Sequence, residues 1–228
     1  MNLERVVTAL INNEVLEQDR LFIKSWLDTY FDSPYRDILM SHPAKTEEED
    51  YGVPSDMQDG VVDEEGWVRW RMLDSEVTVD QINELIASYI KPGSDTHSTS
   101  FSLPPLYTAY LSSRYVLNVY LRYEGFTIEL PNLPSDSPLR ELRNLWSSSE
   151  LLVKAGYIPF ASYEDHAGPV CWDTSKPNDD NDYAVVWFDH DILTEEGQPS
   201  REQLEHYAQP LFHSFREMLM RSSSSTRS

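Results

Sequence analysis

The apolar positions at the start of the chain recur with the period of an α-helix. They fall into two groups: Leu3, Val6, Val7 and Leu10, then Phe22, Trp26, Leu27 and Tyr30. Residues 1–45 are therefore predicted to form a helical appendage. Residues 46–66 carry nine acidic and no basic side chains, and Pro and Gly interrupt any periodicity. This segment is predicted to be an acidic linker or an exposed acidic loop, and we place a domain boundary there.

A capping box formed by Thr78 and Gln81 predicts the start of a second helical region. Apolar side chains then recur along one helical face until the pair Pro92-Gly93 ends the pattern. Residues 103–107 open another helix, because proline is tolerated in a first helical turn. A further helical pattern covers Leu139 to Trp146.

The C-terminal region repeats the same signals. Ser200 and Gln203 form a second capping box, and apolar residues from Leu204 to Leu219 line one stripe. This pattern predicts a single closing helix. The Ser-rich tail, residues 221–228, is expected to be disordered.

Strand-forming residues dominate the middle of the chain. The segment from Tyr115 to Leu130 predicts a hairpin that turns at Glu124-Gly125. Further strands are expected at Tyr157 to Tyr163, Gly168 to Asp173 and Tyr183 to Phe188. The last of these is a continuous apolar run, typical of an interior strand buried on both faces. Residues 67–220 are therefore predicted to form an α+β domain with a mainly antiparallel sheet flanked by helices.

The charge of the chain narrows the classes of partner. The 228 residues include 39 acidic and 18 basic side chains, which gives a formal net charge of −21. Such a chain is repelled by a nucleic-acid backbone and by an anionic bilayer, so neither is expected as a partner. No apolar run reaches the ~18 residues of a membrane span, and we expect a cytoplasmic protein. The charge fits either a basic protein partner or a role in solubility alone.

The motifs of common enzymes are absent from the sequence. It contains no GxGxxG, GxxxxGK[ST], HExxH or CxxC pattern, and we expect no cofactor, no metal and no catalysis. Asn178, Asp180 and Asp182 alternate like calcium ligands, but Tyr183 stands where a calcium loop needs Gly. The single cysteine, Cys171, is expected to be a buried small hydrophobe.

Carboxylates cluster on both sides of the predicted strand at Tyr183 to Phe188. They are interpreted either as solvated loops or as a rim that faces a basic partner. The predicted partner-binding residues are Asp173, Asp179, Asp180, Asp182, Asp189 and Asp191. The aromatic residues Phe160, Trp172 and Trp187 are expected in the core, beside Cys171.

The order of four sequence segments resembles the SUKH superfamily over residues 67–220. The segments are VTVDQINELIASY, LPPLYTAYL, GYIPFASYEDHAGPVCWD and DYAVVWFDHD, and the predicted amphipathic closing helix follows them. The residues that match the family pattern are Leu103, Pro104, Tyr107, Tyr110, Leu111, Ile158, Pro159, Phe160, Ala161, Asp165, Gly168, Cys171, Asp173, Trp187, His190 and Asp191. One departure is that residues 114–117, RYVL, stand where the family usually has an Asn-Gly pair.

The SUKH superfamily includes the yeast cell-wall glucan-synthesis regulator and many bacterial immunity proteins. The resemblance implies an α+β fold that serves as a recognition surface. It further implies an immunity protein that neutralises a cognate toxin, and the acidic charge of the chain favours a basic toxin such as a nuclease. The alternative is a non-catalytic regulatory scaffold in cell-wall synthesis or morphogenesis. Fold analogy alone does not decide between these two functions.

Overall fold

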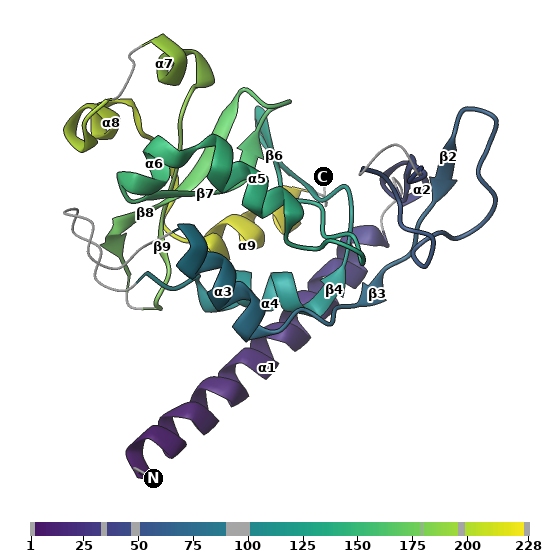
Figure 1. The fold of residues 1–228 in the computed structure, drawn as a ribbon, viewed down its shortest axis with the longest axis horizontal. Coiled ribbons are helices and arrows are strands. Elements are labelled where there is room, and N and C mark those ends of the chain that lie inside the picture. The colour runs from purple at the N-terminus through teal and green to yellow at the C-terminus, as the bar shows by residue number, and fades with distance from the viewer. Residues whose placement is uncertain are drawn as a thin grey trace.

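A six-stranded antiparallel sheet forms the centre of the molecule, with the strand order β10-β9-β8-β7-β6-β5 (Figure 1). The computed structural model describes residues 3–32, 36–46, 51–89, 101–178, 180–195 and 199–225. The strands of this sheet are β5 (Tyr120–Tyr123), β6 (Phe126–Glu129), β7 (Tyr157–Tyr163), β8 (Gly168–Pro177), β9 (Tyr183–Trp187) and β10 (Gln209–Phe212). Two small sheets pair β1 (Ser41–Pro43) with β2 (Trp67–Arg69), and β3 (Leu73–Asp74) with β4 (Arg114–Tyr115).

Helices pack on both faces of the six-stranded sheet, which confirms the predicted α+β class. They are α1 (Leu3–Phe31), α2 (Arg36–Leu39), α3 (Val79–Tyr89), α4 (Pro105–Ser113), α5 (Arg140–Ser148), α6 (Glu150–Lys154), α7 (His190–Glu195), α8 (Arg201–Tyr207) and α9 (Phe215–Ser225). None of the helices in the described ranges is both long and apolar enough to cross a membrane.

The interior position predicted for the strand at Tyr183 to Phe188 is confirmed. Strand β9 lies between β8 and β10, and its two central valines are buried on opposite faces. Val185 packs in the main core, whereas Val186 packs in a smaller core with Leu152 of α6 and Leu204 of α8. The continuous apolar run therefore reflects burial on both faces of the sheet.

Aromatic rings fill the centre of the main core. Tyr107 of α4 lies edge-on to Trp172 at 4.7 Å and to Phe215 of α9 at 5.1 Å between ring centroids. Its hydroxyl donates a hydrogen bond of 3.1 Å to the carbonyl oxygen of Phe160. Phe160, Trp172 and Cys171 are fully buried, which confirms their predicted place in the core. Helix α4 is buried on most of its circumference, because it contains no charged residue.

Both predicted capping boxes are present. The backbone N–H of Gln81 donates to Thr78 Oγ1 over 3.2 Å, and that of Thr78 donates to Gln81 Oε1 over 2.9 Å. Ser200 and Gln203 make the equivalent pair of bonds at the start of α8. The predicted helix stop at Pro92-Gly93 lies outside the described residues.

The predicted hairpin at Glu124-Gly125 is also present, between β5 and β6. Strand β5 begins only at Tyr120, because Asn118 adopts a left-handed conformation with φ 56°. The side chain of Asn118 donates hydrogen bonds to the carbonyl oxygens of Leu39 and Ser41, at 2.9 and 3.1 Å. These bonds tie the segment between β4 and β5 to the segment between α2 and β1.

The single closing helix predicted after Ser200 is wrong. Helix α8 ends at Tyr207, strand β10 follows, and α9 begins only at Phe215. Pro210 explains the break, since proline has no N–H for a helical bond and favours an extended residue before it. Strand β10 lies at the edge of the sheet, the position in which a strand tolerates proline. Helix α9 continues to Ser225, so residues 221–225 of the tail are helical, and residues 226–228 lie outside the described ranges.

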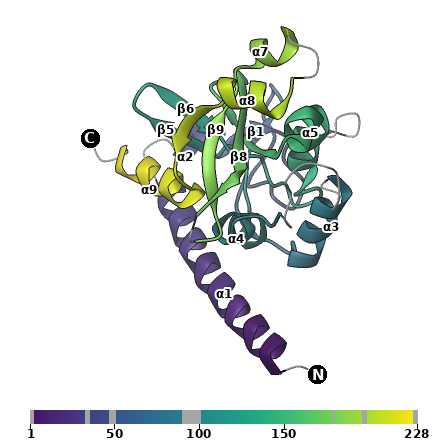
Figure 2. The same cartoon turned by 90° about the vertical axis from the view of Figure 1, so that its left-hand side faces the viewer.

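The helix predicted near the N-terminus is present, but its second part packs in the main core, so the helix is not a separate appendage. Figures 1 and 2 show the first part of α1 projecting from the molecule and the second part lying beside α4. Ile23, Leu27 and Phe31 are buried in the same main core as the sheet. Val53 and Met57, inside the predicted linker, are also buried there. Described residues before, within and after segment 46–66 therefore share one core, and their packing shows no domain boundary at this segment.

Truncation of Trp172 to Ala is expected to lower the free energy of unfolding by about 3–5 kcal/mol, because the fully buried indole leaves a cavity. Trp67→Ala is the matched control, since that side chain is 43% exposed and surface changes cost about 1 kcal/mol or less. Urea unfolding at constant m-value measures both. Equal losses of unfolding free energy for the two variants would contradict the burial of Trp172 in the core.

Candidate protein-binding surface

Asp173, predicted to face a partner, is instead part of a buried ion-pair network. Its side chain is 0% exposed, and Oδ1 accepts hydrogen bonds from Arg201 Nη2 at 2.6 Å and Ser175 Oγ at 2.7 Å. Lys176 Nζ lies 3.1 Å from Oδ2. Burial raises the pKa of Asp173, but the bonds from Arg201, Ser175 and Lys176 outweigh it and lower the pKa below its usual 3.8. The network joins β8 to α8.

Asp182 is also structural, with only 4% of its surface exposed. Its Oδ2 accepts the backbone N–H of Phe215 at 2.9 Å, and its Oδ1 accepts that of Tyr183 at 2.7 Å. The carboxylate thus receives a free N–H from the first turn of α9, where negative charge is favoured. Burial raises its pKa above the ordinary value, despite these hydrogen bonds.

The remaining predicted acids do not form one rim. Asp180 is exposed in the turn before β9, and Asp179 lies outside the described residues. Asp189 and Asp191 follow the other end of β9, and the five residues of this strand, at ~3.3 Å per residue, separate them from Asp180 by at least about 15 Å. The structure therefore separates the described members of the predicted set into two buried structural residues, the exposed Asp180, and the pair Asp189 and Asp191 at the far end of β9.

Several hairpin tips meet at the end of the sheet that carries Asp189 and Asp191. The backbone N–H and Nδ1 of His190 both donate to the carbonyl oxygen of Ala167, at 3.0 and 2.8 Å. The backbone N–H of Glu164 donates to the carbonyl of Thr127 at 3.0 Å. The loops joined by these bonds and the β5–β6 turn carry five carboxylates, which we call the acidic rim: Glu124, Glu164, Asp165, Asp189 and Asp191. All are exposed except Asp189, which is half-buried.

A row of stacked aromatic rings crosses the sheet at the same end. It consists of Tyr123, Phe126, Tyr163 and Trp187, and we call it the aromatic row. Successive ring centroids lie 4.9, 5.3 and 4.2 Å apart, and the planes of Tyr163 and Trp187 differ by only 7°. All four side chains are partly exposed, so the expected core position of Trp187 is corrected to the margin of the core.

Gly168 allows the chain after β9 to pass close to β8, beside the closest contact of the row. Tyr163 and Trp187 belong to strands on either side of β8, and Gly168 stands opposite Tyr163 in the register. Trp187 stands opposite Val170, two residues further along β8. A Cβ atom on Gly168 would lie 1.8 Å from the carbonyl oxygen of Phe188, so only glycine fits.

The loop between β7 and β8 is held in an unusual conformation. Glu164, Asp165 and His166 have φ values of 32°, 42° and 66°. Left-handed backbone costs roughly 1–2 kcal/mol for each residue with a Cβ atom. The N–H of Ala167 bonds to the carbonyl oxygens of Tyr163 and Glu164, both at 2.8 Å, and fixes the turn. The two carboxylates of this loop therefore project from a fixed backbone.

This arrangement suits recognition of a protein. Tyr and Trp contribute strongly to binding when a partner buries them, and exposed carboxylates around them favour a basic partner. The aromatic row was missed in the sequence because Tyr123, Phe126, Tyr163 and Trp187 lie on separate strands. The only local signal was that Tyr123 and Phe126 flank the Glu124-Gly125 turn.

Asp189, His190 and Asp191 place one ligand atom each within 4.8 Å of one another. His190 already bonds the Ala167 carbonyl through Nδ1, and its Nε2 lies 3.0 Å from Asp191 Oδ1. The bond to the Ala167 carbonyl and the charge of Asp191 raise the pKa of His190, which disfavours the neutral form that a metal needs. These residues are better described as part of the acidic rim.

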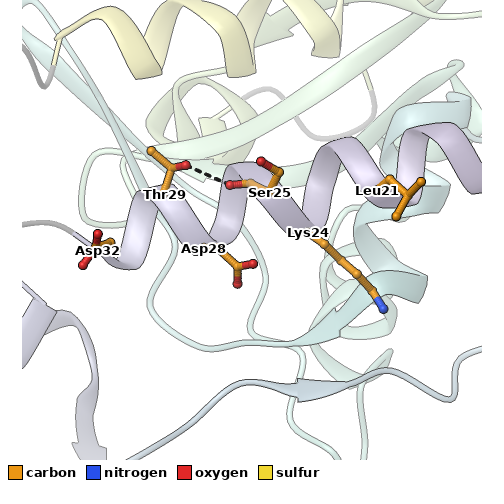
Figure 3. Close-up of a pocket in the computed structure, with 6 residues that line it drawn as sticks. All are labelled: Leu21, Lys24, Ser25, Asp28, Thr29 and Asp32. Atoms are coloured by element: carbon orange, nitrogen blue, oxygen red, sulfur yellow. Dashed lines mark hydrogen bonds between the residues drawn. The ribbon is translucent and has the colours of Figure 1, made fainter.

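A hollow beside α1 offers little for a ligand. Its lining residues are Leu21, Lys24, Ser25, Asp28, Thr29 and Asp32, all at the exposed side of one helix (Figure 3). Lys24 Nζ lies 2.7 Å from Asp74 Oδ1, and Thr29 Oγ1 donates to the carbonyl oxygen of Ser25 at 2.9 Å. These polar groups serve contacts within the chain.

Replacement of Asp173 by Asn is expected to cost about 2–3 kcal/mol of stability at neutral pH, because Arg201 and Lys176 lose a charged partner. The pKa of Asp173 is lowered in the folded state, so its stabilisation is present above the unfolded pKa and is lost as the pH falls. The difference between wild type and Asp173→Asn should therefore shrink below about pH 4. Urea unfolding across pH measures it, with exposed Asp180→Asn as control. A pH-independent difference would contradict the ion-pair assignment.

Comparison with known proteins adds no family name to this geometry: no family model matches the chain, and no curated protein matches it.

Proposed function

We propose that the chain is a non-catalytic protein-recognition domain that binds a basic protein through the aromatic row and the acidic rim. The observation that carries the proposal is the row itself, four partly exposed rings stacked across the sheet and bordered by carboxylates. Rings held in this way lose little conformational freedom on binding. The row would supply contact energy, and the rim would speed encounter.

The partner class that we propose is a cognate toxin of basic charge, which the chain neutralises in the cytoplasm as an immunity protein. The resemblance to the SUKH superfamily supports this assignment, and so does the net charge of −21. Secreted nucleases are commonly basic because they bind the phosphates of nucleic acid, and an acidic inhibitor is attracted to that basic surface. A regulatory scaffold would bind its partners without abolishing their activity, so the two functions differ in a measurable outcome.

The test uses the product of the gene next to the one that encodes this chain. The adjacent product should be toxic when expressed alone, and co-expression of the chain should restore growth. Trp187→Ala should weaken binding by about 2 kcal/mol or more, as expected for a hot-spot aromatic residue. Its melting temperature is measured alongside, because Trp187 also packs against the main core. Binding without restored growth would favour the scaffold.

A charge variant tests the rim without touching the core. Glu164→Gln, Asp165→Asn and Asp191→Asn together should slow association with the toxin at low ionic strength, and the effect should fade at physiological salt. Glu84→Gln, Asp180→Asn and Glu202→Gln together make the matched control, since these exposed acids lie away from the rim and change the net charge equally. Equal effects of the two variants on the association rate, or an association rate that is independent of salt, would contradict the proposed interface.

A further inference from the structure

A second exposed surface lies on the opposite side of the molecule from α7 and α8, in the loop that leads into β2 (Figure 1). Residues 59–69 form this loop, which we call the acidic hairpin. Three of its apolar side chains face solvent: Val61 is 91% exposed, Trp67 43% and Val62 40%. Single exposed apolar residues are common, but three within seven residues of one segment make that segment a candidate interaction site.

The acidic hairpin is ordered by its own hydrogen bonds. The backbone N–H of Asp63 donates to the carbonyl of Trp67 at 2.8 Å, and Asp63 Oδ1 accepts the N–H groups of Trp67 and Glu65 at 2.8 and 3.0 Å. At the base, the N–H of Asp59 donates to the carbonyl of Arg69 at 2.8 Å. The loop therefore presents its apolar side chains from a fixed backbone, which reduces the entropy lost on binding.

The base of the hairpin is anchored in the main core. Met57, Val68 and Trp70 are buried there, and Trp70 Nε1 donates to the carbonyl oxygen of Leu39 at 3.1 Å. Trp67 and Val68 are neighbours on β2 and point to opposite sides, so Trp67 faces outward while Val68 faces the core. The exposure of Trp67 thus follows from the register of β2 on the core and is not a sign of poor packing.

Charge selects the partner of this surface. Asp59, Asp63, Glu64 and Glu65 border the three apolar side chains, and no basic side chain in the described ranges pairs with them. The one basic residue of the hairpin is Arg69, and its Nη2 lies 3.4 Å from Asp37 Oδ1. A second copy of this chain would bring a like net charge of −21 against these carboxylates, which disfavours self-association.

We propose that the acidic hairpin is a second docking site, separate from the aromatic row, for a basic peptide segment with an apolar anchor. Lys or Arg side chains of the segment would face Asp59, Glu64 and Glu65, and its apolar residue would pack on Trp67 and Val61. Such a site would let the chain hold a second partner, or a second region of the same partner.

Selection of peptides from a random 12-residue phage library on the full chain tests this proposal. Selected peptides should carry net positive charge and at least one large apolar residue. Synthetic copies should bind Trp67→Ala at least about tenfold more weakly than wild type, as a hot-spot residue would require. Val61→Ser should weaken the same peptides, and both variants should lower the melting temperature by no more than about 4 °C, because surface changes cost about 1 kcal/mol or less.

The control is Trp187→Ala, which alters the aromatic row and its packing on the main core but no residue of the acidic hairpin, and should leave binding of these peptides unchanged. Peptides that depend on Trp187 and not on Trp67 would overturn the second site while supporting the first. A selection that enriches no peptide for wild type over Trp67→Ala, or enriches acidic peptides, would also overturn it.

Discussion

The stack of Trp172 on Phe160 is the contact on which the rest of the structure depends. The two rings lie 4.1 Å apart at 16° on neighbouring strands, and Tyr107 of α4 meets both rings edge-on. This contact fixes the central strands to the most buried helix, and α1 and α9 then pack around that helix. The hydrogen bonds of an antiparallel sheet lie in the plane of the sheet and favour neither face. Packing of apolar side chains therefore decides which face excludes water.

The same contact decides which side chains reach the end of the sheet. Once Trp172 faces the main core, strand alternation sends Val170 to that face and Cys171 to the other. Trp187 lies opposite Val170 in the register and so reaches the margin of the main core beside Tyr163. The aromatic row is therefore an extension of the core to the surface. Its members pack against the main core while part of each ring remains exposed.

Acidic residues serve two distinct roles in this chain. Asp173 and Asp182 are buried and bind Arg201 and the N-terminus of α9, so they hold the two last helices in place. The carboxylates of the acidic rim and of the acidic hairpin project from fixed loops and border exposed aromatic or aliphatic side chains. Formal charge alone does not separate these roles. Burial and hydrogen bonding do, because a buried carboxylate needs partners within the chain.

The sequence by itself determined the elements whose causes are local. The capping boxes at Thr78 and Ser200, the turn at Glu124-Gly125 and the doubly buried strand at Tyr183 could all be predicted, since each depends on neighbouring residues. Pro210 also carried a local signal for the break between α8 and β10, but the apolar stripe across it concealed that signal. Only the tertiary structure decided that α1 shares the main core, that Asp173 finds Arg201 and that four aromatic rings align across the sheet. These facts depend on contacts between residues far apart in the chain, and helical or strand periodicity contains no information on which distant segments meet.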